Sequence, residues 1–130
     1  MPSSEKPSRG ACGLRVLLVE DETVIAIMLE EMLAEFGHEV VGTVARLDKA
    51  MELARREAFD VAILDVNLNG KEVYPVAETL AARGIPFVFA TGYGSGGLRA
   101  DYRQRPTLPK PFLRSDLRQV LAEACSANSP

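Results

Sequence analysis

Four short polar stretches of this sequence carry side chains that could act together chemically. Two of them are acidic, namely Glu20-Asp21-Glu22 and the single residue Asp65. The others are Thr91-Gly92, which offers a hydroxyl and an unhindered backbone N–H, and Lys110, which stands between two prolines. Carboxylates that are gathered and buried without a partner repel one another, so a cation must lie among them.

The residue types indicate which cation this is and what it could do. Lys110 can neutralise one carboxylate, and the remaining ligands are oxygens with no histidine or cysteine nearby. Such ligands suit a hard divalent ion such as Mg²⁺, which keeps coordination positions for water or phosphate oxygens. Asp65 would then be free to act as a nucleophile on phosphorus, with Thr91 and Gly92 as donors to the phosphoryl oxygens.

Each of these stretches follows a short apolar run that is typical of a buried strand. Residues 61–64 are bounded by Asp60 and by Asn/Gly turn signals, which favours a strand buried on both faces. The other runs are residues 15–19, 86–90 and 106–108. The carboxyl ends of parallel strands meet at one edge of a sheet, and open α/β sheets bind ligands there. We therefore expect the four stretches to converge.

Segments with helical periodicity alternate with these strands. They cover residues 23–36, 47–56, about 72–83 with Pro75 one turn inside, and 113–124, and a short strand is expected at 38–43. The strand-helix alternation predicts a doubly wound, five-stranded parallel α/β sheet. Residues 92–97 are rich in glycine and only Leu98 to Arg105 could form a brief helix, so the fourth helix is expected to be short or absent.

Length and composition predict one domain over residues 14–125, with a disordered tail at 1–13 and a second tail at 126–130. The formal charge is 15 − 18 = −3 and no basic patch stands out, which argues against nucleic acid as a direct partner. No apolar run approaches the roughly 20 residues that a membrane span needs. We therefore expect a cytoplasmic protein.

In this order, the motifs resemble the receiver domains of two-component response regulators. The resemblance rests on Val19-Glu20-Asp21-Glu22, the strand that ends in Asp65, Ala90-Thr91-Gly92, and Pro109-Lys110-Pro111-Phe112, and it extends over about residues 14–124. It implies a flavodoxin-like fold. It also implies roles at matching positions: the phosphoacceptor Asp65, the Mg²⁺ ligands Glu20, Asp21, Asp65 and the Asn67 carbonyl, the switch hydroxyl Thr91, and the phosphate-binding Lys110.

One stretch further resembles a subclass of these receivers. Phe89-Ala90-Thr91-Gly92-Tyr93-Gly94 is similar to the motif of FAT-GUY receivers, whose partners are commonly histidine kinases of the HWE class. One position departs from the usual pattern, because Thr107 stands where receivers commonly carry Tyr or Phe, three residues before the lysine. We therefore expect the glycine-rich connection after Thr91 to serve as the conformational switch.

The resemblance implies a stand-alone signalling domain and not a turnover enzyme. Asp65 would accept a phosphoryl group from a sensor histidine kinase or a phosphotransfer protein, and the altered surface would act on a downstream protein. The alternative is an aspartate-based, Mg²⁺-dependent phosphatase or phosphotransferase. Such enzymes typically carry a second Asp two residues after the nucleophile, and Asn67 at this position argues for a covalent state that persists.

Overall fold

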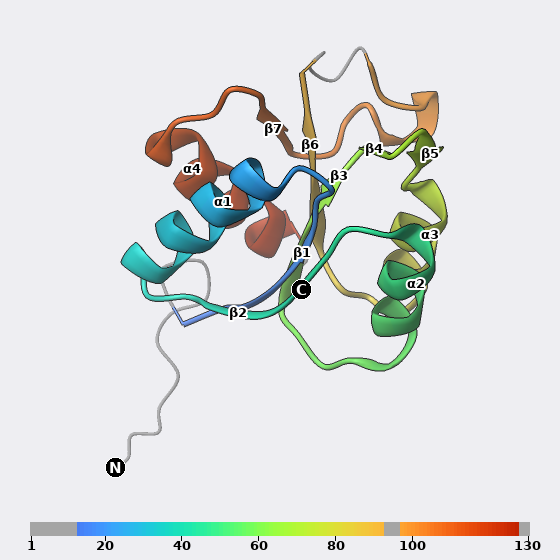
Figure 1. Cartoon of the computed structure of the whole chain (residues 1–130), viewed down its shortest axis with the longest axis horizontal. Coiled ribbons are helices and arrows are strands. Elements are labelled where there is room, and N and C mark those ends of the chain that lie inside the picture. The colour runs from blue at the N-terminus through green and yellow to red at the C-terminus, as the bar shows by residue number, and fades with distance from the viewer. Residues whose placement is uncertain (1–12, 93–96, 128–130) are drawn as a thin grey trace.

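A five-stranded parallel sheet lies at the centre of the computed structural model, which describes residues 13–92 and 97–127 (Figure 1). Its strands are β1 (Arg15–Val19), β2 (Glu39–Val44), β3 (Val61–Asp65), β6 (Phe87–Thr91) and β7 (Thr107–Pro109). The order in the sheet is β2-β1-β3-β6-β7 and all neighbours are parallel. The predicted doubly wound fold is therefore confirmed.

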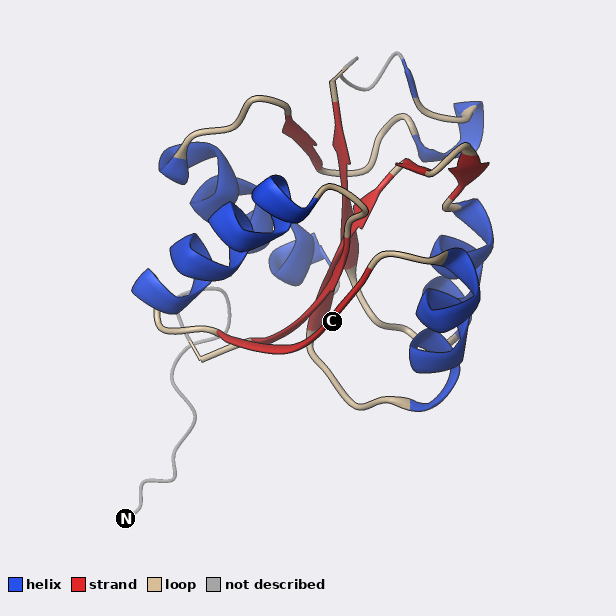
Figure 2. Ribbon diagram, viewed as in Figure 1, coloured by secondary structure: helices blue, strands red, loops and turns tan. Residues whose placement is uncertain are grey.

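Four helices cover the two faces of this sheet (Figure 2). They are α1 (Thr23–Glu35), α2 (Leu47–Arg56), α3 (Tyr74–Ala82) and α4 (Arg114–Ala127). In the picture, α1 and α4 lie on one face, and α2 and α3 lie on the other. The α4 helix continues two residues beyond the predicted end of the domain at residue 125, so part of the expected C-terminal tail is helical.

The sheet separates two apolar clusters. Successive strand residues point to opposite faces: Leu64 packs in the cluster with α2 and α3, whereas Ile63 packs in the cluster with α1 and α4. All five residues of β3 are buried, as expected for a central strand covered on both faces. From β1 the chain connects to β2 on one side of the sheet, and from β3 it continues to β6 and β7 on the other side. In open α/β sheets, ligands bind at this switch point between β1 and β3.

Glycines terminate two of the helices. Gly37 has φ = 86° after α1 and Gly84 has φ = 73° after α3, a backbone region that glycine adopts without a steric penalty. After α1 the N–H of Gly37 donates to the Ala34 carbonyl at 3.0 Å, and the N–H of His38 donates to the Leu33 carbonyl at 2.9 Å. These paired bonds form the Schellman motif and satisfy carbonyls that the helix end would leave unpaired.

A small hairpin that sequence periodicity did not predict follows β3. Its strands are β4 (Asn67–Leu68) and β5 (Lys71–Glu72), which pair antiparallel. The two turn residues Asn69 and Gly70 have φ values of 52° and 86°, and two successive positive φ angles characterise the tight turn that Asn-Gly favours. The predicted helix after this loop consequently begins at Tyr74, with Pro75 in its first turn, where proline is tolerated.

The connection between β6 and β7 contains no α-helix among the residues that the structure describes there. The 3₁₀ turn η3 (Ala100–Tyr102) lies in this connection, as expected for a fourth helix that is short or absent. Leu98 and Tyr102 are buried, so the second half of the connection packs against the core. Residues 93–96, which include two of the four glycines of the predicted flexible run, lie outside the described part of the chain.

The predicted N-terminal tail lies outside the described residues except for Gly13, whose N–H donates to the Gly37 carbonyl at 3.0 Å. Within the part of the chain that the structure describes, no helix has both the length and the apolar character that crossing a membrane requires.

Candidate functional site

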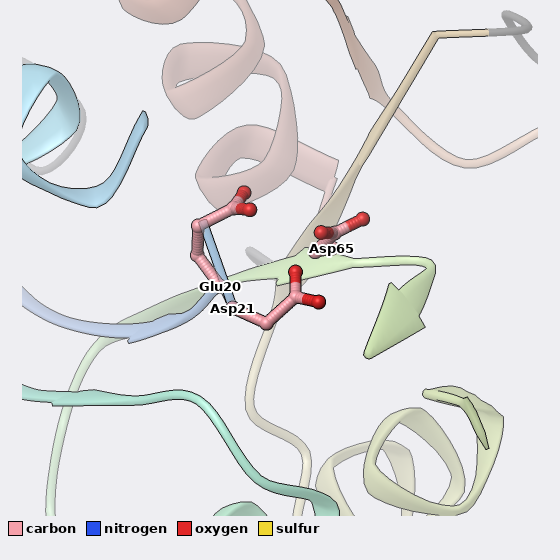
Figure 3. A group of neighbouring side chains, drawn as sticks. All are labelled: Glu20, Asp21 and Asp65. Atoms are coloured by element: carbon pink, nitrogen blue, oxygen red, sulfur yellow. The ribbon is translucent and has the colours of Figure 1, made fainter. Parts of the chain in front are cut away.

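Three carboxylates converge where β1 and β3 end, as the sequence predicted. Glu20 and Asp21 follow β1 directly, and Asp65 is the last residue of β3. Figure 3 shows the three side chains on neighbouring segments at this edge of the sheet. One oxygen from each lies within 4.8 Å of the others, which is close enough for one ion to contact all three.

Lys110 supplies the cation among these carboxylates. It follows β7, and its Nζ lies 3.2 Å from Glu20 Oε1 and 3.3 Å from Asp65 Oδ2. Its backbone N–H donates to the Thr91 carbonyl at 3.0 Å, which holds the lysine beside the end of β6. A single ammonium thus bridges two carboxylates that arrive from different strands.

The pKa values of Asp65 and Lys110 are both raised, for different reasons. Burial and the nearby Glu20 carboxylate together raise the pKa of Asp65 to about 7, although Lys110 and the Asn67 N–H oppose the change. Burial lowers the pKa of Lys110, but the Asp65 and Glu20 carboxylates outweigh this effect and leave it above its ordinary value. Lys110 therefore stays charged at neutral pH, whereas Asp65 is poised between its two forms.

Thr91 and Gly92 lie at the end of β6, beside Asp65. Asp65 pairs with Ala90 in the sheet, so the next residue, Thr91, extends past Asp65 on the neighbouring strand. Thr91 is buried and Gly92 is exposed. A Cβ added at Gly92 would meet no atom of the described residues within 4 Å, so the space on the Cβ side of this residue is open.

A cavity of about 540 Å³ joins these groups. Its lining residues are Asp21, Glu22, Asp65, Val66, Asn67, Glu72, Thr91, Gly92, Gly97 and Lys110. Glu20 does not line it: this residue is only 3% exposed, and its carboxylate contacts Lys110 and the N–H of Glu22. The environments of the two predicted metal ligands of the acidic pair thus differ, since Asp21 lines the cavity and Glu20 is buried in contact with Lys110.

The hairpin forms one wall of the cavity. The N–H of Asn69 donates to Asp21 Oδ2 at 2.9 Å, and the N–H of Asn67 donates to Asp65 Oδ1 at 3.3 Å. This wall brings Glu72 to the cavity, although the helical periodicity of residues 72–83 predicts Glu72 at the start of a helix. The dipeptide Asn69-Gly70 was the signal that could have revealed the hairpin.

The donor set fits a hard divalent cation. Asp21, Asp65 and Asn67 present oxygen atoms to or beside the cavity, and no histidine or cysteine lines it among the described residues. Glu20 Oε1 is buried without a hydrogen bond, and its contact with Lys110 at 3.2 Å leaves this oxygen within reach of further positive charge. Mg²⁺ accepts such carboxylate and carbonyl oxygens.

Aromatic side chains flank the site where Thr107 replaces the usual aromatic residue. Tyr102 stacks on Tyr74 with ring centroids 5.7 Å apart and meets Phe87 and Phe89 edge to face. Arg99 lies over both tyrosine rings, at 4.9 Å and 5.0 Å from their centroids. Tyr102 thus fastens the connection after β6 to α3 and to the strand that carries Thr91.

Comparisons with known proteins show the family to which this chain belongs. The family model of the response regulator receiver domain matches residues 16–122. PdtaR, a transcriptional regulatory protein of Mycobacterium tuberculosis, is 37% identical over 116 residues, which are 86% of this chain and 57% of PdtaR. The chain thus spans little more than half of this relative's length. The matched region shows that the chain belongs to the family of response regulator receiver domains.

Solved structures of related receivers match most of the chain. The solution structure of SdrG from Sphingomonas melonis Fr1 is 44% identical with a TM-score of 0.74, and the match covers 91% of this chain and 97% of SdrG. SdrG has also been solved in a BeF3-activated conformation, which matches with 46% identity, a TM-score of 0.75, and coverage of 85% and 95%. The receiver domain of the Pseudomonas aeruginosa sensor histidine kinase PA1611, solved with magnesium in its active-site cleft, is 27% identical with a TM-score of 0.73, covering 88% of this chain and 99% of that domain.

Proposed function

We propose that this receiver accepts a phosphoryl group on Asp65 and passes the resulting change of surface to a protein partner. The observation that carries the proposal is the convergence of Asp65, Thr91, Gly92 and Lys110 on one cavity, with Lys110 Nζ 3.3 Å from the Asp65 carboxylate. A nucleophile, a fixed cation and two hydrogen-bond donors at one point are the components that phosphoryl transfer needs.

In the transfer, one bond to phosphorus forms and one bond to phosphorus breaks. An oxygen of the ionised Asp65 carboxylate attacks phosphorus, and the P–N bond to a donor histidine breaks. The donor ring carries a proton on its other nitrogen, so it leaves as neutral imidazole. Lys110 offsets the charge on the phosphoryl oxygens, while the Thr91 hydroxyl and the Gly92 N–H donate hydrogen bonds to them. Because Asp65 has a pKa of about 7, it must first release its proton, and added positive charge beside it favours this release.

Asp21, Asp65 and the Asn67 carbonyl would hold Mg²⁺, with Glu20 behind them. When bound, the ion would offset charge on the transferred group. The Mg²⁺-containing PA1611 receiver supports this choice of metal.

Asn67 argues against the alternative, a phosphatase or phosphotransferase that turns over many substrate molecules. Its side-chain oxygen accepts the N–H of Gly70 at 2.8 Å, so the amide is used to hold the hairpin turn. An amide also cannot serve as the general acid and base that rapid hydrolysis of an aspartyl phosphate requires. The aspartyl phosphate should therefore persist as a signal, with slow autodephosphorylation.

Partners are proposed from the family and from the motif at Thr91. The donor would be a sensor histidine kinase, of the HWE class if the FAT-GUY resemblance extends to pairing, or a phosphotransfer protein. The match to 97% of the SdrG chain supports a signalling role like that of a receiver, and the domain would act in the cytoplasm on a downstream protein and not on nucleic acid or membrane.

Intact-mass spectrometry tests the phosphoacceptor. Incubation with a small phosphodonor and Mg²⁺ should add one phosphoryl group to the wild-type chain and none to Asp65→Asn, whose amide has nearly the same shape but is a poor nucleophile. A single lasting adduct supports the receiver. Release of free phosphate over many turnovers would favour the enzyme, and an adduct of equal yield on Asp65→Asn would exclude Asp65 as the acceptor.

A further inference from the structure

Glu72 lies on the solvent side of the site cavity and has no role in the transfer described above. It is exposed, yet it lines the same cavity as the buried Asp65. Any phosphodonor that reaches Asp65 enters a space that Glu72 lines.

The pairing of the hairpin explains why Glu72 faces the cavity. Asn67 pairs with Glu72, and Leu68 pairs with Lys71. Directly opposed residues of an antiparallel pair share a face, and successive residues alternate between faces. Leu68 is buried in the core, so the other face of the hairpin presents Asn67 and Glu72, and both line the cavity.

Hydrogen bonds hold this wall in place relative to Asp65. The turn is attached to Asp21 through the Asn69 N–H at 2.9 Å. The base of the hairpin is closed by the Val73 N–H, which donates to the Val66 carbonyl at 2.9 Å. Glu72 precedes Val73, so its backbone is positioned by the residues that also form the acceptor site.

Glu72 carries charge that its surroundings do not neutralise. Lys110 is the only cationic residue that lines the cavity among the described residues, and its Nζ lies within 3.7 Å of oxygens of Glu20, Glu22 and Asp65. No lysine or arginine of residues 13–92 and 97–127 lies within 4.0 Å of the Glu72 carboxylate. An incoming phosphoryl group therefore meets, at the wall of the cavity, a negative charge that no cation of the described residues pairs with.

We propose that Glu72 is a specificity-determining residue that selects among phosphodonors by charge. Repulsion from Glu72 opposes a free dianionic donor more strongly than a monoanionic one, so it suppresses phosphorylation by small metabolites that carry two negative charges. This inference rests on the proposed function of Asp65.

The variant Glu72→Gln tests this role because it removes the charge and keeps the shape. Rates of adduct formation are measured by intact mass at saturating Mg²⁺, with acetyl phosphate as the dianion and phosphoramidate as the monoanion. With acetyl phosphate at low salt, the variant should react about threefold faster than wild type, as expected for one charge across a solvated site. The gain should be smaller with phosphoramidate and should vanish at about 0.5 M salt.

Two controls separate charge from structure. Glu72→Asp keeps the charge and should react like wild type, and Glu57→Gln makes the same charge change at the distant C-terminal end of α2 and should also react like wild type. Equal rates for Glu72→Gln and wild type with acetyl phosphate would overturn the role of Glu72 alone. A wild-type chain that forms no adduct with either donor would overturn the proposed function as well.

Discussion

Lys110 makes it possible to bury two carboxylates at the end of the sheet. Glu20 is 3% exposed and Asp65 is 7% exposed, and an isolated charge at either position would be costly. The ammonium lies within 3.3 Å of both, yet it does not fully compensate them, because burial and Glu20 still raise the pKa of Asp65. A further cation beside these carboxylates would lower the pKa of Asp65 toward its ordinary value.

His38 is expected to make the stability of the domain depend on pH. It is the single histidine of the chain, and its Nδ1 accepts the N–H of Leu14 at 3.1 Å next to the ring of Phe36. Burial lowers the pKa of His38 below its ordinary value of 6.5. The bond is intact above the unfolded pKa and is lost as pH falls through the folded pKa, because a proton on Nδ1 would face the Leu14 N–H.

Urea unfolding and NMR check this expectation. Between about pH 7.5 and pH 5, His38 should contribute a loss of about 1 kcal/mol in unfolding free energy. His38→Asn keeps an acceptor near the Nδ1 position but does not titrate, so subtracting its pH profile from that of wild type isolates the effect. A histidine NMR titration with a midpoint at or above the ordinary pKa would contradict the prediction.

Among the elements, the connection from β6 to β7 depends on Tyr102 for its position. The tyrosine ring packs against α3 and β6, and Arg99 extends the attachment through Glu78, 2.9 Å away, on α3. The connection thus joins the strand that carries Thr91 to a helix on the surface. A phosphoryl group bound at Thr91 and Gly92 could alter this attachment, which makes the connection the best candidate for the switch.

Tyr102→Ala should release this connection without unfolding the sheet. Loss of a buried aromatic ring typically costs about 3 kcal/mol, and here the cost should fall mainly on a segment that can open by itself. Hydrogen exchange at residues 98–105 should accelerate by about tenfold or more, while exchange in β1 and β3 changes little. Beryllium fluoride should alter NMR shifts at these residues in wild type and much less in the variant.

Tyr102→Phe is the matched control, because it keeps the ring and its packing. It should show exchange and shift changes close to those of wild type. If Tyr102→Ala left the exchange of residues 98–105 unchanged, the aromatic cluster would not hold the connection in place.

For the molecule as a whole, Mg²⁺ should raise the melting temperature at neutral pH. The carboxylates of Glu20, Asp21 and Asp65 lie together, and a ligand that binds only the folded state stabilises it by mass action. At about a hundredfold excess over Kd, the gain should be about 2.7 kcal/mol. Calorimetry with and without the metal measures it.

Asp21→Asn should reduce this Mg²⁺ effect, since Asp21 faces the cavity. Glu123→Gln, an equal charge change on the outer side of α4, should leave it intact. A Mg²⁺ titration that is the same in Asp21→Asn and in wild type would remove Asp21 from the metal site.

The amino-acid sequence alone determined the fold and the composition of the candidate site. Short apolar runs that end in polar residues specify buried parallel strands, and helical periodicity between them specifies the layers on either face. The carboxyl ends of parallel strands share one edge, so the convergence of Asp21, Asp65, Thr91 and Lys110 followed from these patterns without coordinates. Local sequence patterns specify the strands and helices, and the parallel arrangement of the strands specifies which residues meet at the edge.

Features that depend on side-chain contacts across the fold required the three-dimensional structure. The hairpin has two residues in each strand, too few to show a period, and so Glu72 resembled an acid at a helix start. Adjacent in sequence, Glu20 and Asp21 differ because one carboxylate is buried against Lys110 and the other reaches the cavity. Tyr102 takes its place among aromatic rings from α3 and β6, which are distant in sequence, and spacing along the chain carries no information about such contacts.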